Sequence, residues 1–198
     1  MTCIVALRDP TKRTVVMGGD SRRAMNGSLV LQLPESAAKV FGFSGFAVGH
    51  TGVGRIRQLT ARLNVRFGPR GPSGAFDLED VLVELIIPQI KRRAREAGVL
   101  HEKEGITDLG GEVLVAFGHQ MCLIGGDFTV TPIRDNFWAI GGGQRLALGS
   151  LATSERVHRG MRVTRRVQLA LEVAARFDNT VAPPFTYVET LPIPYELA

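Results

Sequence analysis

The stretch MTCIVAL at residues 1–7 is the most informative part of this chain for its fold. It leads through the polar segment DPTKR, residues 9–13, into a second apolar stretch, TVVMGGDSR, at residues 14–22. Two apolar runs that flank a short polar turn containing proline predict a β-hairpin. Removal of Met1 would leave Thr2 with a free α-amine at the start of the first strand.

A threonine with a free α-amine carries both a nucleophile and its base, because the pKa of such an amine is about 7.7–8.0. Asp20 ends the second strand, and Lys39 begins a further apolar run, KVFGF, at residues 39–43. A charged Lys39 would favour the alkoxide and keep the amine neutral, and Asp20 would orient Lys39. Gly49 lies between a strand and a helix, where its N–H could stabilise a tetrahedral intermediate.

Each of these residues also has a purely structural explanation. Thr2 could be an ordinary strand residue behind a retained Met1, and Asp20 could be a turn residue. Lys39 could be a surface charge, and Gly49 could be a loop glycine. The four residues occur together in a chain whose expected order of strands and helices fits a catalytic site. This combination favours a catalytic role over four separate structural roles.

Strands are expected at residues 2–7, 14–19, 28–33, 39–43 and 46–50, and again at 112–117, 120–124, 128–133, 137–140 and 185–191. Helical periodicity predicts helices at 53–67, 77–97, 144–153 and 164–177. Asp77 would cap the second helix, Pro88 would kink it and Gly98 would end it. Clustered strands joined by short turns indicate antiparallel sheets, so the fold class is α+β. Two sheets with helix pairs outside them fit this order, although periodicity alone allows other α+β arrangements.

Composition indicates one compact domain over residues 1–198, because 44% of the residues are hydrophobic. No apolar stretch approaches the ~20 residues needed to span a membrane, and no signal peptide is expected. The two cysteines, Cys3 and Cys122, form no pattern, which favours a reduced, cytoplasmic setting. Because Cys3 alternates with Thr2 along a strand, its thiol is expected on the opposite, core-facing side.

A net charge of +5 and a pI near 9.8 could indicate nucleic-acid binding. The basic residues gather at 55–70, 91–95 and 156–166, where they fit solvated helix faces, and the aromatic residues that would stack on bases are not interleaved with them, Phe67 standing alone. Nucleic acid is therefore not the expected partner. The four histidines lack metal-ligand spacing, so no metal is expected. His50 could line a substrate cleft, but a structural role is the stronger expectation.

The chain resembles proteasome β-subunits and the related bacterial and phage proteins of the HslV and Anbu type, within the N-terminal-nucleophile hydrolases. The resemblance covers nearly the whole chain. It rests on MTCIVAL (1–7), GGDSR (18–22), AKVF (38–41), VGHT (48–51), WAIGGG (138–143) with ALG (147–149), AARFD (174–178) and PFT (184–186).

This resemblance implies a four-layer αββα sandwich and a threonine peptidase that needs no metal or organic cofactor. It implies that Thr2 attacks a peptide carbonyl and forms an ester that water releases, with Lys39 tuning the site and Asp20 as its partner. The Gly49 N–H would bind the oxyanion. It also implies a polypeptide substrate, assembly into a ring or spiral of identical subunits, and a possible ATP-dependent unfoldase partner.

The sequence departs from the family pattern around the terminal amine. Ser21 and Asp178 match supporting positions, but Gly142 stands where a serine is usual. Val181 stands where a second serine is usual, three residues after Asp178. Water or Ser150 could substitute for the lost hydroxyls. The alternative to an active peptidase is therefore a weak or inactive homologue that forms structural rings.

Overall fold

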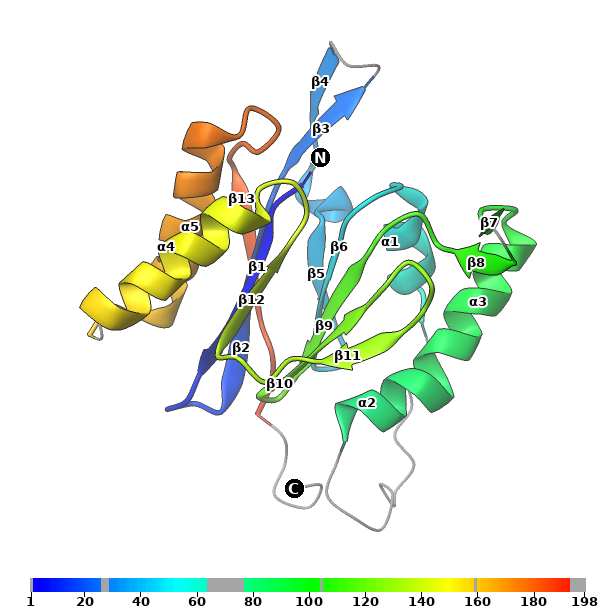
Figure 1. The fold of residues 1–198 in the computed structure, drawn as a ribbon, viewed down its shortest axis with the longest axis horizontal. Helices are drawn as coiled ribbons and strands as arrows, with labels where there is room; N and C mark the ends of the chain where they lie inside the picture. Colours follow the sequence, from blue (N-terminus) through cyan, green and yellow to red (C-terminus); the bar gives the residue numbers. More distant parts are fainter. Residues whose placement is uncertain (1, 26–28, 64–76, 104, 159, 193–198) are drawn as a thin grey trace.

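The structure is a computed structural model that describes residues 2–25, 29–63, 77–103, 105–158 and 160–192. Two antiparallel sheets face each other and carry helices on their outer surfaces, which gives four layers (Figure 1). The expected αββα arrangement is confirmed.

The first sheet has the strand order β12-β1-β2-β13. Its two central strands form the hairpin predicted from the N-terminal sequence. All four strands are antiparallel, and Ile4 in β1 lies opposite Gly19 in β2 and Ile140 in β12. The bounds are β1 (Ile4–Asp9), β2 (Thr14–Asp20), β12 (Phe137–Ile140) and β13 (Phe185–Glu189).

The second sheet has the strand order β11-β10-β9-β6-β5. Its bounds are β5 (Val40–Phe43), β6 (Phe46–His50), β9 (Val113–Phe117), β10 (Gln120–Ile124) and β11 (Val130–Pro132). The hairpin of β5 and β6 turns at Ser44 and Gly45, whose φ angles are 48° and 85°. Two consecutive positive φ angles match the type I′ turn, whose twist suits a two-residue hairpin.

Helices α4 (Gln144–Val157) and α5 (Val163–Phe177) cover the first sheet. The outer face of the second sheet is covered by α1 (Arg55–Thr60), α2 (Leu78–Val81), a π-helical segment η2 (Leu82–Ile86) and α3 (Ile87–Glu96). The π-helical segment ends two residues before Pro88, which is consistent with a local break in the helical hydrogen bonds where proline has no N–H. Asp77 accepts a hydrogen bond from Glu79 N and caps α2, as expected.

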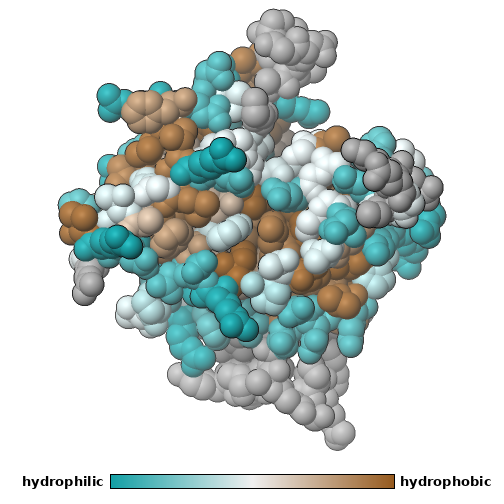
Figure 2. Space-filling model, in the orientation of Figure 1, coloured by the Kyte–Doolittle hydropathy of each residue, from teal (hydrophilic) through white to brown (hydrophobic). Residues whose placement is uncertain are grey.

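Buried side chains form three clusters, one between each pair of adjacent layers. Ile4, Ala6 and Met17 pack between the two sheets, whereas Cys3 and Val5 pack against α4 and α5. This alternation along β1 follows from the two-residue period of a strand. On the face drawn in Figure 2, hydrophobic residues gather in the middle, over the sheets, and hydrophilic residues surround them.

Several boundaries differ from those predicted. The chain that follows β2 forms β3 (Arg22–Met25), which pairs with β4 (Leu29–Gln32), and a short 3-10 helix, η1 (Glu35–Ala37), follows. The segment between α3 and β9, where no strand is predicted, contains a small hairpin of β7 (His101–Lys103) and β8 (Ile106–Asp108). Part of the first predicted helix, residues 64–67, and the first residue of the strand predicted at 28–33 lie outside the described residues. None of the described helices is long and apolar enough to cross a membrane.

Candidate active site

The residues expected to form the site come from strand ends that meet at one end of the two sheets. Thr2 precedes β1, Asp20 ends β2, and Lys39 directly precedes β5. Thr2 and Lys39 both line a cavity of about 670 Å³. The other residues that line it are Arg22, Arg23, Leu33, Ala37, His50, Thr51, Gly52, Val53, Gly54, Arg57, Gln58, Gly141 and Gly142.

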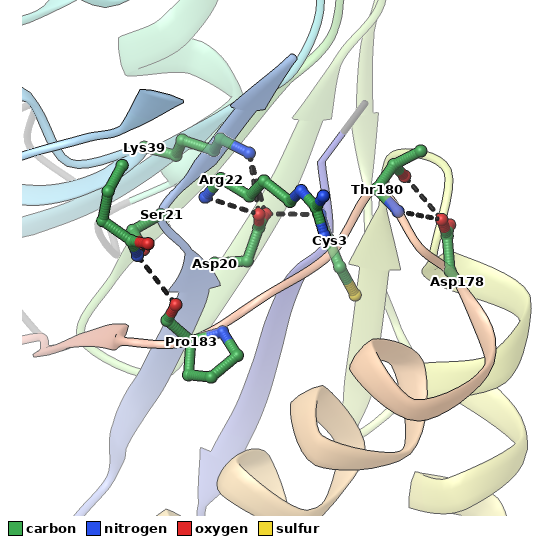
Figure 3. Close-up of polar contacts among 9 residues, drawn as sticks. Cys3, Asp20, Ser21, Arg22, Lys39, Asp178, Thr180 and Pro183 are labelled. Atoms are coloured by element: carbon green, nitrogen blue, oxygen red, sulfur yellow. Dashed lines mark hydrogen bonds and ion pairs between the residues drawn. The ribbon is translucent and has the colours of Figure 1, made fainter. Parts of the chain in front are cut away.

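Asp20 and Lys39 form a buried ion pair at the base of this site (Figure 3). Lys39 Nζ lies 2.9 Å from both carboxylate oxygens of Asp20, and the two residues are 5% and 1% exposed. The same carboxylate accepts hydrogen bonds from Cys3 N at 2.9 Å and Arg22 N at 3.0 Å. Asp20 therefore links the ammonium group of Lys39 to the peptide bond that follows Thr2.

Burial lowers the pKa of Lys39, and the charge and hydrogen bonds of Asp20 oppose that shift. Lys39 thus gives up its proton more readily than an exposed lysine, while a neighbouring negative charge still favours its charged form. A lysine in this setting can stabilise a nearby alkoxide or exchange a proton with it.

The turn at residues 141–143 encloses the backbone carbonyl of Thr2. Gly143 N donates a hydrogen bond to Thr2 O at 3.4 Å. Gly141 has a φ of +94°, and a Cβ atom at this position would lie 2.2 Å from Thr2 O. Only glycine allows this close approach, so the turn fixes the backbone of the residue expected to be the nucleophile. Met1, whose removal the prediction requires, lies outside the described residues.

Cys3 is a core residue, as its position on the strand predicts. Its thiol is buried with α4 and α5, on the side of β1 away from the Asp20–Lys39 pair (Figure 3). Burial, with smaller contributions from Asp20 and Asp178, raises the pKa of Cys3 to about 12. A thiol in this state is a poor nucleophile.

Ser21 and Asp178, which were expected to support the terminal amine of Thr2, form hydrogen bonds with other residues. Ser21 Oγ accepts a hydrogen bond from Gln32 Nε2, which also donates to Pro183 O at 2.7 Å. Asp178 Oδ1 accepts hydrogen bonds from the backbone N and the hydroxyl of Thr180 at 2.8 and 2.5 Å. The Thr180 hydroxyl beside Asp178 was not anticipated from the sequence.

The positions of the missing serines carry no hydroxyl. Gly142 lines the cavity, and Val181 is buried among the apolar residues beneath α4 and α5. Ser150 lies seven residues beyond Gly143 along α4, a distance of about 10 Å along the helix axis. Ser150 therefore cannot replace the hydroxyl at position 142.

Gly49 lies inside β6, between the two sheets, and is not among the residues that line the cavity. It is paired with Val40 in β5 and with Leu114 in β9. Because His50 N donates to Lys39 O, the alternation of an antiparallel strand directs the Gly49 N–H toward β9. Gly52, just beyond β6, does line the cavity.

Two residues of the cavity were expected to have other roles. His50 was expected to be structural, but it lines the cavity and its two ring nitrogens have no hydrogen-bond partner in the described structure. Arg57 belongs to a basic stretch interpreted as a solvated helix face, yet it also lines the cavity. The sequence signal available for His50 was its place directly after Gly49, at the end of a strand.

Burial lowers the pKa of His50 to about 4, with smaller contributions from the charges of Arg57 and Lys39. An unfolded histidine takes up a proton near pH 6.5, whereas folded His50 resists protonation until about pH 4. The stability that depends on neutral His50 is therefore complete above pH 6.5 and is lost as the pH falls toward 4. We expect His50→Gln to reduce the loss of unfolding free energy between pH 7 and pH 4 by about 3 kcal/mol, measured by urea denaturation.

The exposed His158 offers a matched control for this measurement. His158→Gln removes a histidine from the exposed surface, and its pH profile is the reference with which that of His50→Gln is compared. Parallel pH profiles for the His50→Gln variant and the unmodified protein would show that burial does not hold His50 neutral.

No protein-family model matches the sequence, and no curated protein matches it. Solved structures do match. BPH from Thiobacillus denitrificans superposes with a TM-score of 0.76 over 98% of this chain and 100% of that chain, at 16% identity. HslV from Trypanosoma brucei gives a TM-score of 0.65 over 95% of this chain and 98% of that chain, at 19% identity.

This chain has the proteasome-like fold of the N-terminal-nucleophile hydrolases. Anbu from Hyphomicrobium sp. strain MC1 matches it with a TM-score of 0.63 and 13% identity, over 96% of this chain and 82% of that chain. BPH has also been solved in complex with epoxomicin. At these identities the matches establish the proteasome-like fold, and the chemistry of the site must be argued from its own residues.

Proposed function

We propose that this protein is a threonine peptidase of the proteasome β type, with Thr2 as its nucleophile after removal of Met1. The observation that carries this proposal is the buried Asp20–Lys39 pair, which is hydrogen-bonded to the Thr2–Cys3 peptide unit at a cavity lined by Thr2. Burial of two charges is costly and often brings no net stability, so stability alone does not explain this buried ion pair. A role in the activation of Thr2 does explain it.

In the proposed reaction the free α-amine of Thr2 takes the proton from its own hydroxyl, and the hydroxyl oxygen attacks a peptide carbonyl. The charged Lys39 stabilises the developing alkoxide and keeps the amine neutral, while Asp20 holds Lys39 in place. The C–N bond of the tetrahedral intermediate then breaks, the protonated α-amine of Thr2 gives its proton to the leaving nitrogen, and the acyl group stays on Thr2 as an ester. Water hydrolyses this ester and restores the Thr2 hydroxyl. A backbone N–H near the end of β6 would stabilise the oxyanion. Gly49 is the donor expected from the sequence, and Gly52 is a second candidate because it lines the cavity.

The fold matches to HslV and Anbu support a subunit of a ring or spiral of identical chains that acts on polypeptides. An ATP-dependent unfoldase is a possible partner within this proposal. The rival proposal is a structural homologue with little or no activity. It is favoured by Gly142 and Val181, which supply no hydroxyl, and by Asp178, whose carboxylate is bonded to Thr180.

The test is to measure the intact mass of the purified protein and its cleavage of fluorogenic peptides. We expect the mass to show that Met1 has been removed, and Thr2→Ala to lower cleavage by about 10³-fold or more. Thr2→Ser keeps a hydroxyl and is the matched control, which should retain part of the activity. Because BPH forms a complex with epoxomicin, the proposal also predicts that this compound inhibits peptide cleavage by the unmodified protein.

Retention of Met1 in the purified protein would exclude Thr2 as a terminal nucleophile and would favour the structural homologue. Cleavage that survives in Thr2→Ala at the level of the unmodified protein would show that another residue, or a contaminating peptidase, performs it.

A further inference from the structure

The cavity lined by Thr2 has an excess of positive charge. Arg22, Arg23, Lys39 and Arg57 line it, and no aspartate or glutamate is among the lining residues. The charge of Lys39 is already matched by Asp20, which contacts it through both carboxylate oxygens. The arginines form no ion pair with a carboxylate in the part of the chain that the structure describes. Their charge is therefore available to a ligand.

Arg57 is held in place within this cavity. Its Nε donates a hydrogen bond to Ala38 O at 2.8 Å, and its guanidinium lies over the ring of Phe41, 5.3 Å from the centroid. These contacts fix the plane of the guanidinium and leave its two terminal nitrogens for other partners. A fixed guanidinium can bind a carboxylate through two parallel hydrogen bonds with little loss of side-chain entropy.

Arg23 also lines the cavity. It belongs to β3, and its guanidinium nitrogens lie 3.2 Å from the place where a Cβ atom of Gly54 would stand. Gly54 directly precedes α1, the helix that carries Arg57. Arg23 therefore extends from β3 to the start of α1, so both guanidinium groups border the cavity close to this helix.

His50 adds a buried polar group that lacks a partner. It is 6% exposed, lines the cavity, and neither ring nitrogen is hydrogen-bonded in the described structure. A neutral imidazole carries one N–H donor and one acceptor nitrogen. A buried donor without a partner is unfavourable, so a ligand oxygen that accepts a hydrogen bond from His50 would bind favourably.

We propose that this cavity binds the acidic side chain of the substrate residue whose carbonyl is attacked by Thr2. This inference rests on the proposed function, because it assigns a preference to the same site. The side chain of that residue branches one bond from the attacked carbon, so it enters the cavity next to Thr2. Arg23 and Arg57 then neutralise its carboxylate, and His50 donates a hydrogen bond to it or to the adjoining peptide.

The experiment compares two fluorogenic peptides that differ only in glutamate or glutamine at the attacked residue. We expect kcat/KM to be at least about tenfold higher for the glutamate peptide, because glutamine keeps the shape and loses the charge. Arg57→Gln and Arg23→Gln are each expected to bring this ratio toward one. Arg55→Gln removes the same charge from the same helix at a residue outside the cavity lining, and should leave the ratio unchanged.

A binding measurement separates this inference from the proposed function. The same two peptides, with a C-terminal carboxamide in place of the fluorogenic group, are titrated into the Thr2→Ala variant by calorimetry. We expect the glutamate peptide to bind at least about tenfold more tightly than the glutamine peptide. If no peptide is cleaved by the unmodified protein, the proposed function fails and the binding ratio still decides the inference.

Equal kcat/KM values, or equal dissociation constants where no cleavage occurs, would overturn the acidic preference. A third peptide, with glutamate moved two residues upstream, tests whether overall charge explains the result. If it were preferred as strongly as the first, general attraction to a basic protein would account for the preference, and the assignment to this cavity would fall.

Discussion

Lys39→Met is expected to lower the free energy of unfolding by about 3–5 kcal/mol, because it leaves the buried carboxylate of Asp20 without its charged partner. Asp20 would keep its hydrogen bonds from Cys3 N and Arg22 N, but those donors carry no net charge. Urea denaturation at neutral pH measures this loss. Peptide cleavage should fall strongly in the same variant, because the ammonium group proposed to stabilise the alkoxide would be absent.

The double variant Asp20→Asn/Lys39→Met separates stability from catalysis. It contains neither charge, so most of the lost unfolding free energy should return, while cleavage stays lost. If the double variant were as unstable as Lys39→Met, the cost would arise from lost packing and not from an unpaired charge. If it cleaved peptides normally, the ion pair would have no part in the reaction.

Gly141→Ala is expected to destabilise the protein by at least about 3 kcal/mol. The added Cβ atom would lie 2.2 Å from Thr2 O and 2.8 Å from Thr2 C, and neither is a flexible side-chain atom that could move away. The φ of +94° adds strain that an alanine rarely tolerates. Thermal and urea denaturation both measure the effect.

Gly149→Ala is the matched control for this substitution. Gly149 lies within α4, and beyond its chain neighbours and the adjoining backbone of the helix no described atom lies within 4 Å of the place where its Cβ would stand. Alanine there should stabilise the helix by about 0.5–1 kcal/mol. Equal effects of the two substitutions would show that the 141–143 turn does not fix the Thr2 backbone.

Much of the fold could be predicted from local patterns. Apolar runs on either side of short turns located the hairpins β1–β2 and β5–β6, and apolar spacing located α4 and α5. Strands β3, β7 and β8 were missed because each strand is only three or four residues long and contains polar or charged residues. Such strands are held by their neighbours and leave no period-two pattern of their own.

The sequence by itself determined which residues the proposed chemistry needs and where each would lie along its strand. Thr2, Asp20 and Lys39 were found in this way, since a residue's place at a strand end is a local property. Only the tertiary structure decided that Asp20 binds both Lys39 and the Cys3 N–H. It also decided that the Gly49 N–H points toward β9, and that Arg57 and His50 border the cavity. These contacts join strands and helices across two sheets, and such long-range pairing depends on burial and register that no short segment encodes.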